Sequence, residues 1–403
     1  PLSLGDLRTE NMPELVIDAH DRVFREHRDI PYAPVPGEPN LRDVVAANMR
    51  GRFGVDAITS EHVLPIPGSR FGEFAFLDIF YRSFPDKSVL IVDPCWATGP
   101  QQALYTGGSE RLIEMMLPYD PRTLFARLTP TMLSQVLEDY PEIGAVFLTN
   151  PNNPTGQLMT GDEMAGFARI IAKHRVFVLE DMTYGYVTFG HGAPSLQKAA
   201  QTLSEPDKKT LLERVVTILG LQKLVGSGFR VSAIATQNLD ILRSMTGLLS
   251  FTSGPVNKPA QAAAAAYYSN DCGIVGANAD LKQRRLVLAR SLEQARVRLH
   301  ERHGAEVIEH TLGPVVLDEH AHGGGYYAVL RLNERAVSRV CETMGAESMS
   351  AGVVMEFFAR EVGATIQPGA TMRLNNNHLR LAFGAAHTHQ IELLSDRLTH
   401  ALG

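Results

Sequence analysis

From about residue 60 to residue 181, short apolar runs alternate with longer amphipathic stretches. The apolar runs predict strands at 88–92, 111–117, 144–149 and 176–181, and the amphipathic stretches predict helices at 71–84, 130–137 and 161–174. This alternation predicts an α/β fold with a mostly parallel central sheet flanked by helices. Ligands of such sheets bind at the carboxyl ends of the strands, so residues there are the first candidates for a site.

A second, smaller α/β region is predicted toward the end of the chain. Residues 257–302 are largely helical, and they are followed by a strand at 326–332, a helix at 351–361, a strand at 378–383 and a helix at 390–402. A chain of 403 residues can form one large domain with a satellite. We therefore predict a large domain at 41–275 and a small domain made of 1–40 and 276–403, joined by a long helix near 277–302.

Charge and cysteine content narrow the function classes. The net charge of −6 argues against a nucleic-acid or anionic-membrane surface. No apolar run approaches the ~20 residues that span a bilayer, and no signal peptide is expected, although a chain that begins with Pro1 could be clipped. Cys95, Cys272 and Cys341 are far apart and odd in number, which is typical of reduced thiols in a cytoplasmic protein.

Lys223 lies in a glycine-rich stretch between two predicted strands, 214–219 and 231–235, and Arg230 follows it by seven residues. An isolated charge between buried strands is costly. A lysine at this place is therefore expected to be paired, desolvated or covalently used.

Polar residues also cluster at the ends of the other predicted strands. Asp181 ends an apolar strand, Tyr184 follows it, and Asn153 sits in a turn between prolines. Gly68–Ser69 opens a helix, whose free N–H groups form an anion site, and Trp96 directly follows a strand. Taken singly, the acid would be a strand-end cap and the tryptophan a core residue. Together with the lysine they indicate a site for a phosphorylated aromatic aldehyde, pyridoxal 5′-phosphate.

Four blocks of sequence carry a resemblance to a known family. Residues 150–156 read N-P-N-N-P-T-G, and residues 181–184 read D-M-T-Y. Residues 32–42 fit the pattern Y-x-x-x-x-G-x-x-x-L-R, and residues 378–384 contain a late arginine strand. These blocks resemble, in order and spacing, those of the fold-type I pyridoxal phosphate enzymes of the class I/II aminotransferase family. The resemblance covers essentially the whole chain and implies an aspartate-aminotransferase-like fold and an aminotransferase activity.

The resemblance also implies a role for each matching cofactor residue. Lys223 would form the internal aldimine and move the α-proton, for which burial beside cations would lower its pKa. Asp181 would keep the pyridine nitrogen protonated. The other implied contacts are Asn153 and Tyr184 at the ring oxygen, Trp96 stacked on the ring, and Gly68, Ser69 and Arg230 at the phosphate.

Further implied residues concern the substrate and a second subunit. Arg380 would bind the α-carboxylate with its planar fork, and Gly5 belongs to the N-terminal element near the substrate. Tyr32 would reach the phosphate of the other subunit, which implies a homodimer with shared sites. The implied substrates are an amino acid and a 2-oxo acid, and Arg8 or Arg70 would favour an acidic or phosphorylated side chain.

The chain departs from the family around the lysine. Gly220 stands where serine or threonine is common, the seven-residue spacing from Lys223 to Arg230 is one shorter than usual, and Ser232 replaces a glycine. Arg70 places a cation in the first turn of a helix, where the helix dipole disfavours it. We expect Arg70 to face a local anion, either the cofactor phosphate or a substrate group.

These departures leave three hypotheses. The first is transamination; the second keeps the cofactor but ends in elimination, replacement, cyclisation or oxidation of an amino acid. The third is a non-catalytic regulator that binds the cofactor, which the acidic net charge disfavours. The tract D-E-H-A-H at 318–322 is interpreted as a polar loop rather than a metal site, and the glycines at 323–325 as a turn into a strand.

Overall fold

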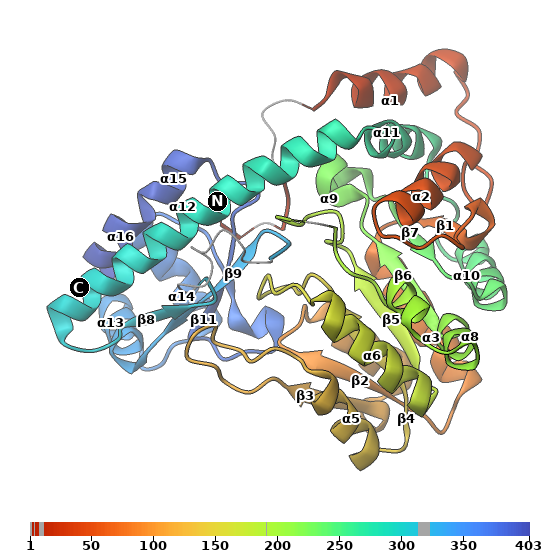
Figure 1. The fold of residues 1–403 in the computed structure, drawn as a ribbon. Helices are drawn as coiled ribbons and strands as arrows, with labels where there is room; N and C mark the ends of the chain where they lie inside the picture. The colour runs from red at the N-terminus through yellow and green to blue at the C-terminus, as the bar shows by residue number, and fades with distance from the viewer. Residues whose placement is uncertain (1, 4, 8–11, 191, 313–322) are drawn as a thin grey trace.

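The computed structural model describes residues 2–3, 5–7, 12–190, 192–312 and 323–403. Its larger sheet has seven strands in the order β1-β7-β6-β5-β4-β2-β3. These are β1 Val63–Ile66, β2 Ser88–Asp93, β3 Leu112–Met116, β4 Ile143–Thr149, β5 Phe177–Met182, β6 Val215–Leu219 and β7 Ser232–Ala235. Only β7 runs antiparallel to its neighbours in this sheet, β1 and β6. The prediction of a mostly parallel sheet is therefore confirmed (Figure 1).

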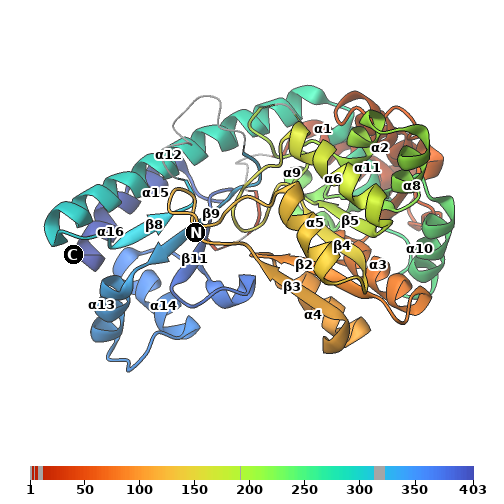
Figure 2. The ribbon, with the colours of Figure 1, turned by 60° about the horizontal axis from the view of Figure 1, so that its bottom comes forward.

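A smaller antiparallel sheet lies toward the other end of the molecule (Figure 2). Its order is β10-β11-β9-β8, with β8 Ile308–His310, β9 Tyr327–Leu332, β10 Gln367–Pro368 and β11 His378–Ala382. The two longer strands, β9 and β11, correspond to the two predicted from sequence. The predicted division between residues 40 and 41 and between 275 and 276 stays a prediction.

Helices surround both sheets. They are α1 Glu14–Glu26, α2 Pro39–Gly51, α3 Ser69–Ser83, α4 Thr98–Gly107, α5 Pro130–Asp139, α6 Gly161–His174, α7 Leu196–Ala199, α8 Glu205–Leu212, α9 Gln222–Val225, α10 Leu239–Phe251, α11 Lys258–Tyr268, α12 Asp271–His303, α13 Glu334–Met344, α14 Ala351–Phe357, α15 Thr388–Glu392 and α16 Leu394–Leu402. None of the helices in the described part of the chain is long and apolar enough to cross a membrane.

Helix α12 runs alongside both sheets (Figures 1 and 2). Its 33 residues correspond to roughly 50 Å at the usual rise of an α-helix. It begins at Asp271, six residues before the predicted start, where Asn270 accepts a hydrogen bond from the N–H of Cys272. The predicted single helix at 390–402 is instead two helices, α15 and α16, that meet at Leu393.

The core of the larger sheet has two faces because neighbouring strand residues point to opposite sides. Leu90 and Val146 pack in one cluster with α5 and α6. Their neighbours Ile91 and Phe147 pack in another cluster with α3 and α10. With both faces covered, the strand ends are the part of the sheet left open to a ligand.

Candidate active site

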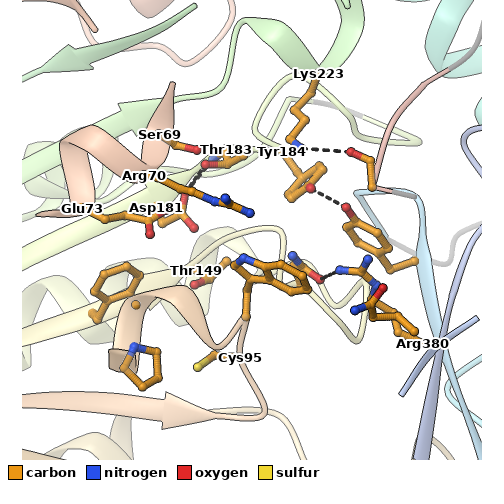
Figure 3. A pocket seen from close by; sticks show the side chains of 18 of the residues that line it. Ser69, Arg70, Glu73, Cys95, Thr149, Asp181, Thr183, Tyr184, Lys223 and Arg380 are labelled. Carbon is orange, nitrogen blue, oxygen red and sulfur yellow. Dashed lines mark hydrogen bonds between the residues drawn. The ribbon is translucent and has the colours of Figure 1, made fainter. Parts of the chain in front are cut away.

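A cavity of about 320 Å³ lies at the carboxyl ends of the central strands and is closed on the other side by the smaller sheet. Its size is at the lower end of the range for small-molecule sites. Most of the residues predicted for the site line it: Gly5, Ser69, Arg70, Trp96, Asn153, Asp181, Tyr184, Lys223, Arg230 and Arg380. Figure 3 shows several of these side chains pointing into the same space.

One end of the cavity has the features of an anion site. Gly68 caps the N-terminus of α3 with a φ of 89°, and a Cβ there would lie 2.4 Å from Nη2 of Arg230. The buried Ser69 begins the helix, and Arg70 follows it. Desolvation and the nearby charge of Arg70 lower the pKa of Arg230. Two cations beside free helix N–H groups favour binding of a phosphate or another anion.

Lys223 stands in the short helix α9, directly after β6. Its Nζ donates a hydrogen bond to the carbonyl oxygen of Gly5 at 3.1 Å. Desolvation lowers the pKa of Lys223 to about 8, and the charge of Arg380 adds to this effect. A substantial fraction of this amine is therefore neutral near pH 8, as a nucleophile or proton carrier requires.

Asp181 lies near the end of β5 with its side chain buried. It accepts hydrogen bonds from the N–H of Thr183 at 2.9 Å and from its hydroxyl at 2.5 Å. Burial raises its pKa, while these bonds and the charge of Lys223 oppose the rise. A buried carboxylate is costly without a cationic partner, yet no ion pair joins Asp181 to the described residues. A cationic ligand group would supply that partner.

Arg380 projects from β11 toward the opposite end of the cavity. Its guanidinium donates to Oδ1 of Asn153 and to the carbonyl oxygen of Ser3, both at 3.1 Å. The Cζ atom lies 4.3 Å from the ring centroid of Tyr327 and 4.8 Å from that of Trp96. Its buried Nε has no partner among the described residues. A buried donor without a partner indicates that a ligand acceptor belongs there.

The N-terminal residues complete the wall between these groups. A Cβ on Gly5 would lie 2.3 Å from the hydroxyl of Tyr327, so only glycine fits. The hydroxyl of Tyr326 donates to the carbonyl oxygen of Gly5 at 3.1 Å. The hydroxyl groups of Tyr184 and Tyr327 hydrogen-bond to each other. Tyr184 is thus held at the cavity, where a ligand oxygen could join its hydrogen bond.

Two of the departures around the lysine have a structural cause. A Cβ at Gly220 would lie 2.2 Å from the carbonyl oxygen of Thr183, so neither serine nor threonine fits there. The buried Ser232 donates to Oε1 of Gln222 at 2.6 Å and holds this residue next to Lys223. Both residues therefore fit the backbone path of this chain, and the cavity beside Lys223 is kept.

Some predicted residues lie elsewhere. Tyr32 is 93% exposed and does not line the cavity of its own chain. Arg8 and the tract 318–322 lie outside the described residues. Within the described ranges, no group of three or more His, Cys, Asp and Glu side chains could hold a metal ion.

Among the cavity residues that the sequence did not predict, Glu73 and Tyr327 bear most on its chemistry. Glu73 follows Ser69 by one helical turn, and this spacing on one helix face was the available signal. Tyr327 follows the predicted glycine turn, but its role depends on contacts with Gly5 and Arg380 at opposite ends of the chain. No local pattern carries that information.

The chemical groups of pyridoxal phosphate fit this set of residues. The anion site suits its phosphate, the unpaired Asp181 suits a protonated ring nitrogen, and the amine of Lys223 suits its aldehyde.

Comparison with known proteins identifies the family. A family model described as "Aminotransferase class I and II" matches residues 1–397. The chain is 26% identical over 260 residues to the aspartate aminotransferase of Geobacillus stearothermophilus, a match that covers 64% of this chain and 61% of the relative. The match thus spans about three fifths of that relative's length.

Solved structures show the same fold. The aspartate aminotransferase of Thermus thermophilus with maleate has a TM-score of 0.77 at 19% identity, covering 99% of this chain and 90% of that one. A PLP-bound C-S lyase of Staphylococcus hominis also has a TM-score of 0.77, at 17% identity and with 100% and 90% coverage. At such identities these structures establish the aspartate-aminotransferase-like fold alone, whereas the family follows from the match along nearly the entire sequence. The chain belongs to the aminotransferase class I and II family.

Proposed function

We propose that the protein is a pyridoxal 5′-phosphate-dependent aminotransferase, which passes the amino group of an amino acid to a 2-oxo acid. One observation carries this proposal: a single cavity contains the amine of Lys223, the buried carboxyl group of Asp181, which has no ion pair, and an anion site formed by two arginines. Membership of the family supports the cofactor. The names of relatives such as the Geobacillus aspartate aminotransferase support the reaction.

The proposal assigns a part of the cofactor to each group of residues. When bound, pyridoxal phosphate supplies an electron sink for the electron pair left on the α-carbon of the substrate. The residues that would hold it are Gly68, Ser69, Arg70 and Arg230 at the phosphate, Asp181 at the ring nitrogen, Asn153 and Tyr184 at the ring oxygen, and Trp96 on the ring face.

Two side chains of the cavity, Lys223 and Arg380, would act on the substrate. Lys223, with a pKa near 8, can take up or give back a proton at Nζ close to physiological pH. Arg380 can bind the substrate carboxylate through its free Nε and a neighbouring guanidinium nitrogen, because a planar fork matches two carboxylate oxygens. The carbonyl oxygens of Gly5 and Ser3 must give up their hydrogen bonds when these groups engage ligands.

A homodimer with shared sites is part of the proposal. Its support is the exposure of Tyr32, which does not serve the cavity of its own chain. A cytoplasmic location is also proposed, and the three free cysteines support it.

The second candidate is elimination, replacement, cyclisation or oxidation of an amino acid with the same cofactor. It is favoured by the unusual residues Gly220 and Ser232 near Lys223 and by the likeness in fold to a C-S lyase. Both candidates use the same lysine and carboxylate-binding arginine, so only the product separates them.

A single-turnover screen tests the proposal. The protein loaded with pyridoxal phosphate is mixed with each common amino acid, and pyridoxamine phosphate and ammonia are quantified. Transamination predicts one pyridoxamine phosphate per site for the correct substrate. Ammonia and a keto acid without pyridoxamine phosphate would instead support the second candidate.

Lys223→Ala is the variant that checks the site, with the surface change Lys87→Ala as its control. We expect Lys223→Ala to lose the visible absorbance of the bound cofactor and all turnover. Retention of both would show that the lysine is misassigned.

A further inference from the structure

A second carboxyl group lies beside Asp181 at the end of the cavity (Figure 3). It belongs to Glu73 of α3, whose side chain is buried with 7% exposure. The described residues give Glu73 no hydrogen bond and no ion pair. A buried carboxyl group of this kind is unusual, because its charged form has lost water without a hydrogen bond or an ion pair in return.

The surroundings of the two carboxyl groups differ. Asp181 accepts two hydrogen bonds from Thr183, and such bonds stabilise the charged form of a carboxyl group. Glu73 lacks them. Two neighbouring buried carboxyl groups do not both ionise readily, because the two charges repel. The charge therefore belongs on Asp181 and the proton on Glu73.

The other charged groups that face Glu73 do not reverse this order. Arg70 on the same helix and Lys223 on α9 favour its ionised form, while burial and the charge of Asp181 oppose it. The latter two effects dominate and raise the pKa of Glu73 to about 8. The thiol of Cys95, which also faces this carboxyl group, remains neutral because burial raises its pKa.

We propose that Glu73 and Asp181 form one proton-sharing pair: in the cofactor-free protein Glu73 keeps the proton at neutral pH, and Asp181 carries the charge that meets the ring nitrogen of the cofactor. Glu73 is then a positioning residue that acts through Asp181. Its part in cofactor binding rests on the proposed function, whereas the pair itself exists in the cofactor-free protein. The two parts can therefore be tested separately.

The first test is the stability of the cofactor-free protein against pH. Between about pH 5 and 8 the folded wild type holds a proton on Glu73 that the unfolded chain has released, so rising pH favours unfolding. Glu73→Gln keeps the shape and removes this proton. We expect the ratio of the unfolding equilibrium constants, wild type over variant, to rise by up to about tenfold for each pH unit.

The second test is the dissociation constant of pyridoxal phosphate at several pH values, measured by equilibrium dialysis. A protonated ring nitrogen beside Asp181 would lower the pKa of Glu73, so binding to the wild type releases a proton and strengthens as pH rises. The variant has no such proton. We expect the ratio of dissociation constants, Glu73→Gln over wild type, to rise by up to about tenfold between pH 6 and 8.

Glu180→Gln is the matched control. Glu180 is also buried and precedes Asp181 on β5, but its partners are Leu196 and Thr217 on the other side of the sheet. This control should change the stability profile and leave the ratio of dissociation constants to wild type independent of pH. Should Glu73→Gln fail to fold, Glu73→Met fills a similar volume and serves the same comparison.

Each result bears on a different part of the proposal. A Glu73→Gln stability profile parallel to that of the wild type would show that Glu73 holds no proton and would overturn the pair. A flattened profile with a constant ratio of dissociation constants would overturn the role toward the cofactor and leave the pair intact. Failure of the wild type to bind pyridoxal phosphate at all would instead overturn the proposed function and, with it, that role.

Discussion

Two opposing sets of neighbouring groups determine the pKa of the Lys223 amine. Desolvation, Arg380 and Arg230 disfavour its charged form, and Asp6 and Asp181 favour it. The first set dominates, which lowers the pKa of Lys223 from its usual 10.5 to about 8. We expect the rate of reductive alkylation of this amine in the cofactor-free protein to rise with a midpoint near pH 8, measured by mass spectrometry of the digest.

Arg380→Gln extends this prediction. Removing the second-largest cause of the lowered pKa should move the midpoint for Lys223 to higher pH, since a nearby cation no longer opposes protonation. The surface residue Lys87 in the same digest supplies the reference. A pH profile for Lys223 that runs parallel to that of Lys87 would contradict the assignment of a perturbed amine.

Gly220 allows a prediction about stability. In Gly220→Ser the new Cβ would be forced to within 2.2 Å of the carbonyl oxygen of Thr183, and the backbone on one side must move. Overpacking of this kind costs about 1–3 kcal/mol or more of folding free energy. Because Thr183 holds Asp181, we also expect weaker binding of pyridoxal phosphate. Urea unfolding and cofactor titration measure the two effects.

Gly228→Ser is the control for this change. Gly228 lies five residues beyond Lys223, and a Cβ there would meet nothing within 4 Å. We expect its unfolding free energy to stay within about 0.5 kcal/mol of the wild type. Restored rather than weakened cofactor binding in Gly220→Ser would show that the hydroxyl is accommodated after all.

The sequence identifies which residues around the lysine are unusual but not why. Gly220 is unusual because of a carbonyl group 37 residues earlier in the chain, and Ser232 because of its bond to Gln222. Both contacts are set by how β5, β6 and β7 lie side by side. A pattern within one stretch of sequence carries no record of that arrangement.

Among the elements, β5 best illustrates how one strand serves two purposes. Successive side chains point to opposite faces of a strand, so Asp181 reaches the cavity while Glu180 points to the other side. Glu180 is completely buried and accepts hydrogen bonds at 2.6 Å from the N–H of Leu196 and the hydroxyl of Thr217. It joins β5 to β6 and to the start of α7.

This arrangement predicts a pH-dependent stability at the level of the strand. Burial raises the pKa of Glu180 from 4.5 to about 7, although its two hydrogen bonds oppose the rise. Its contribution to stability is therefore fully present below pH 4.5 and is lost as pH rises through about 7. We expect the free energy of unfolding of the wild type to fall by up to ~1.4 kcal/mol more per pH unit than that of Glu180→Gln. Urea unfolding at pH 5, 6 and 7 measures this difference. Parallel curves for the two proteins would contradict it.

Elements with strong local signals were predictable. Helix α6 begins and ends where the sequence predicts, because Thr160 and Glu163 form a capping box at its start and apolar residues recur along one face. Strands β8 and β10 have three and two residues, too few for a period to show. Helices α4, α10 and α13 were not predicted either.

At the scale of the molecule, the cavity depends on both ends of the chain. Gly5 and Arg380 come from opposite ends of the sequence, yet they hydrogen-bond to Lys223 and Asn153, which follow β6 and β4 of the larger sheet. Only the resemblance to a family implied that Gly5 and Arg380 belong to one site. No pattern of hydrophobic residues predicts which loop faces which strand. The same resemblance implies that a second subunit completes the site, and that inference can be tested by mixing variants.

The test depends on which subunit supplies Tyr32 and which supplies Lys223 to each site. Tyr32→Phe should weaken pyridoxal phosphate binding roughly tenfold or more, the loss expected for one hydrogen bond to a charged group, and Lys223→Ala should abolish turnover. In a hybrid dimer of the two variants, a site shared between subunits takes Lys223 from one chain and Tyr32 from the other. One of its two sites is then fully intact, so a hybrid isolated with two affinity tags should regain wild-type affinity and half of the wild-type activity.

The opposite assignment gives the opposite result. If Tyr32 served its own subunit, every site in the hybrid would lack either Tyr32 or Lys223, and no site of wild-type affinity would appear. The 93% exposure of Tyr32 in the single chain favours the shared arrangement, since its side chain does not line the cavity of its own chain and is free to contact another subunit. A hybrid with only weak sites, or a protein that remains monomeric at all concentrations, would refute the shared site while leaving Lys223 and Asp181 in their proposed roles.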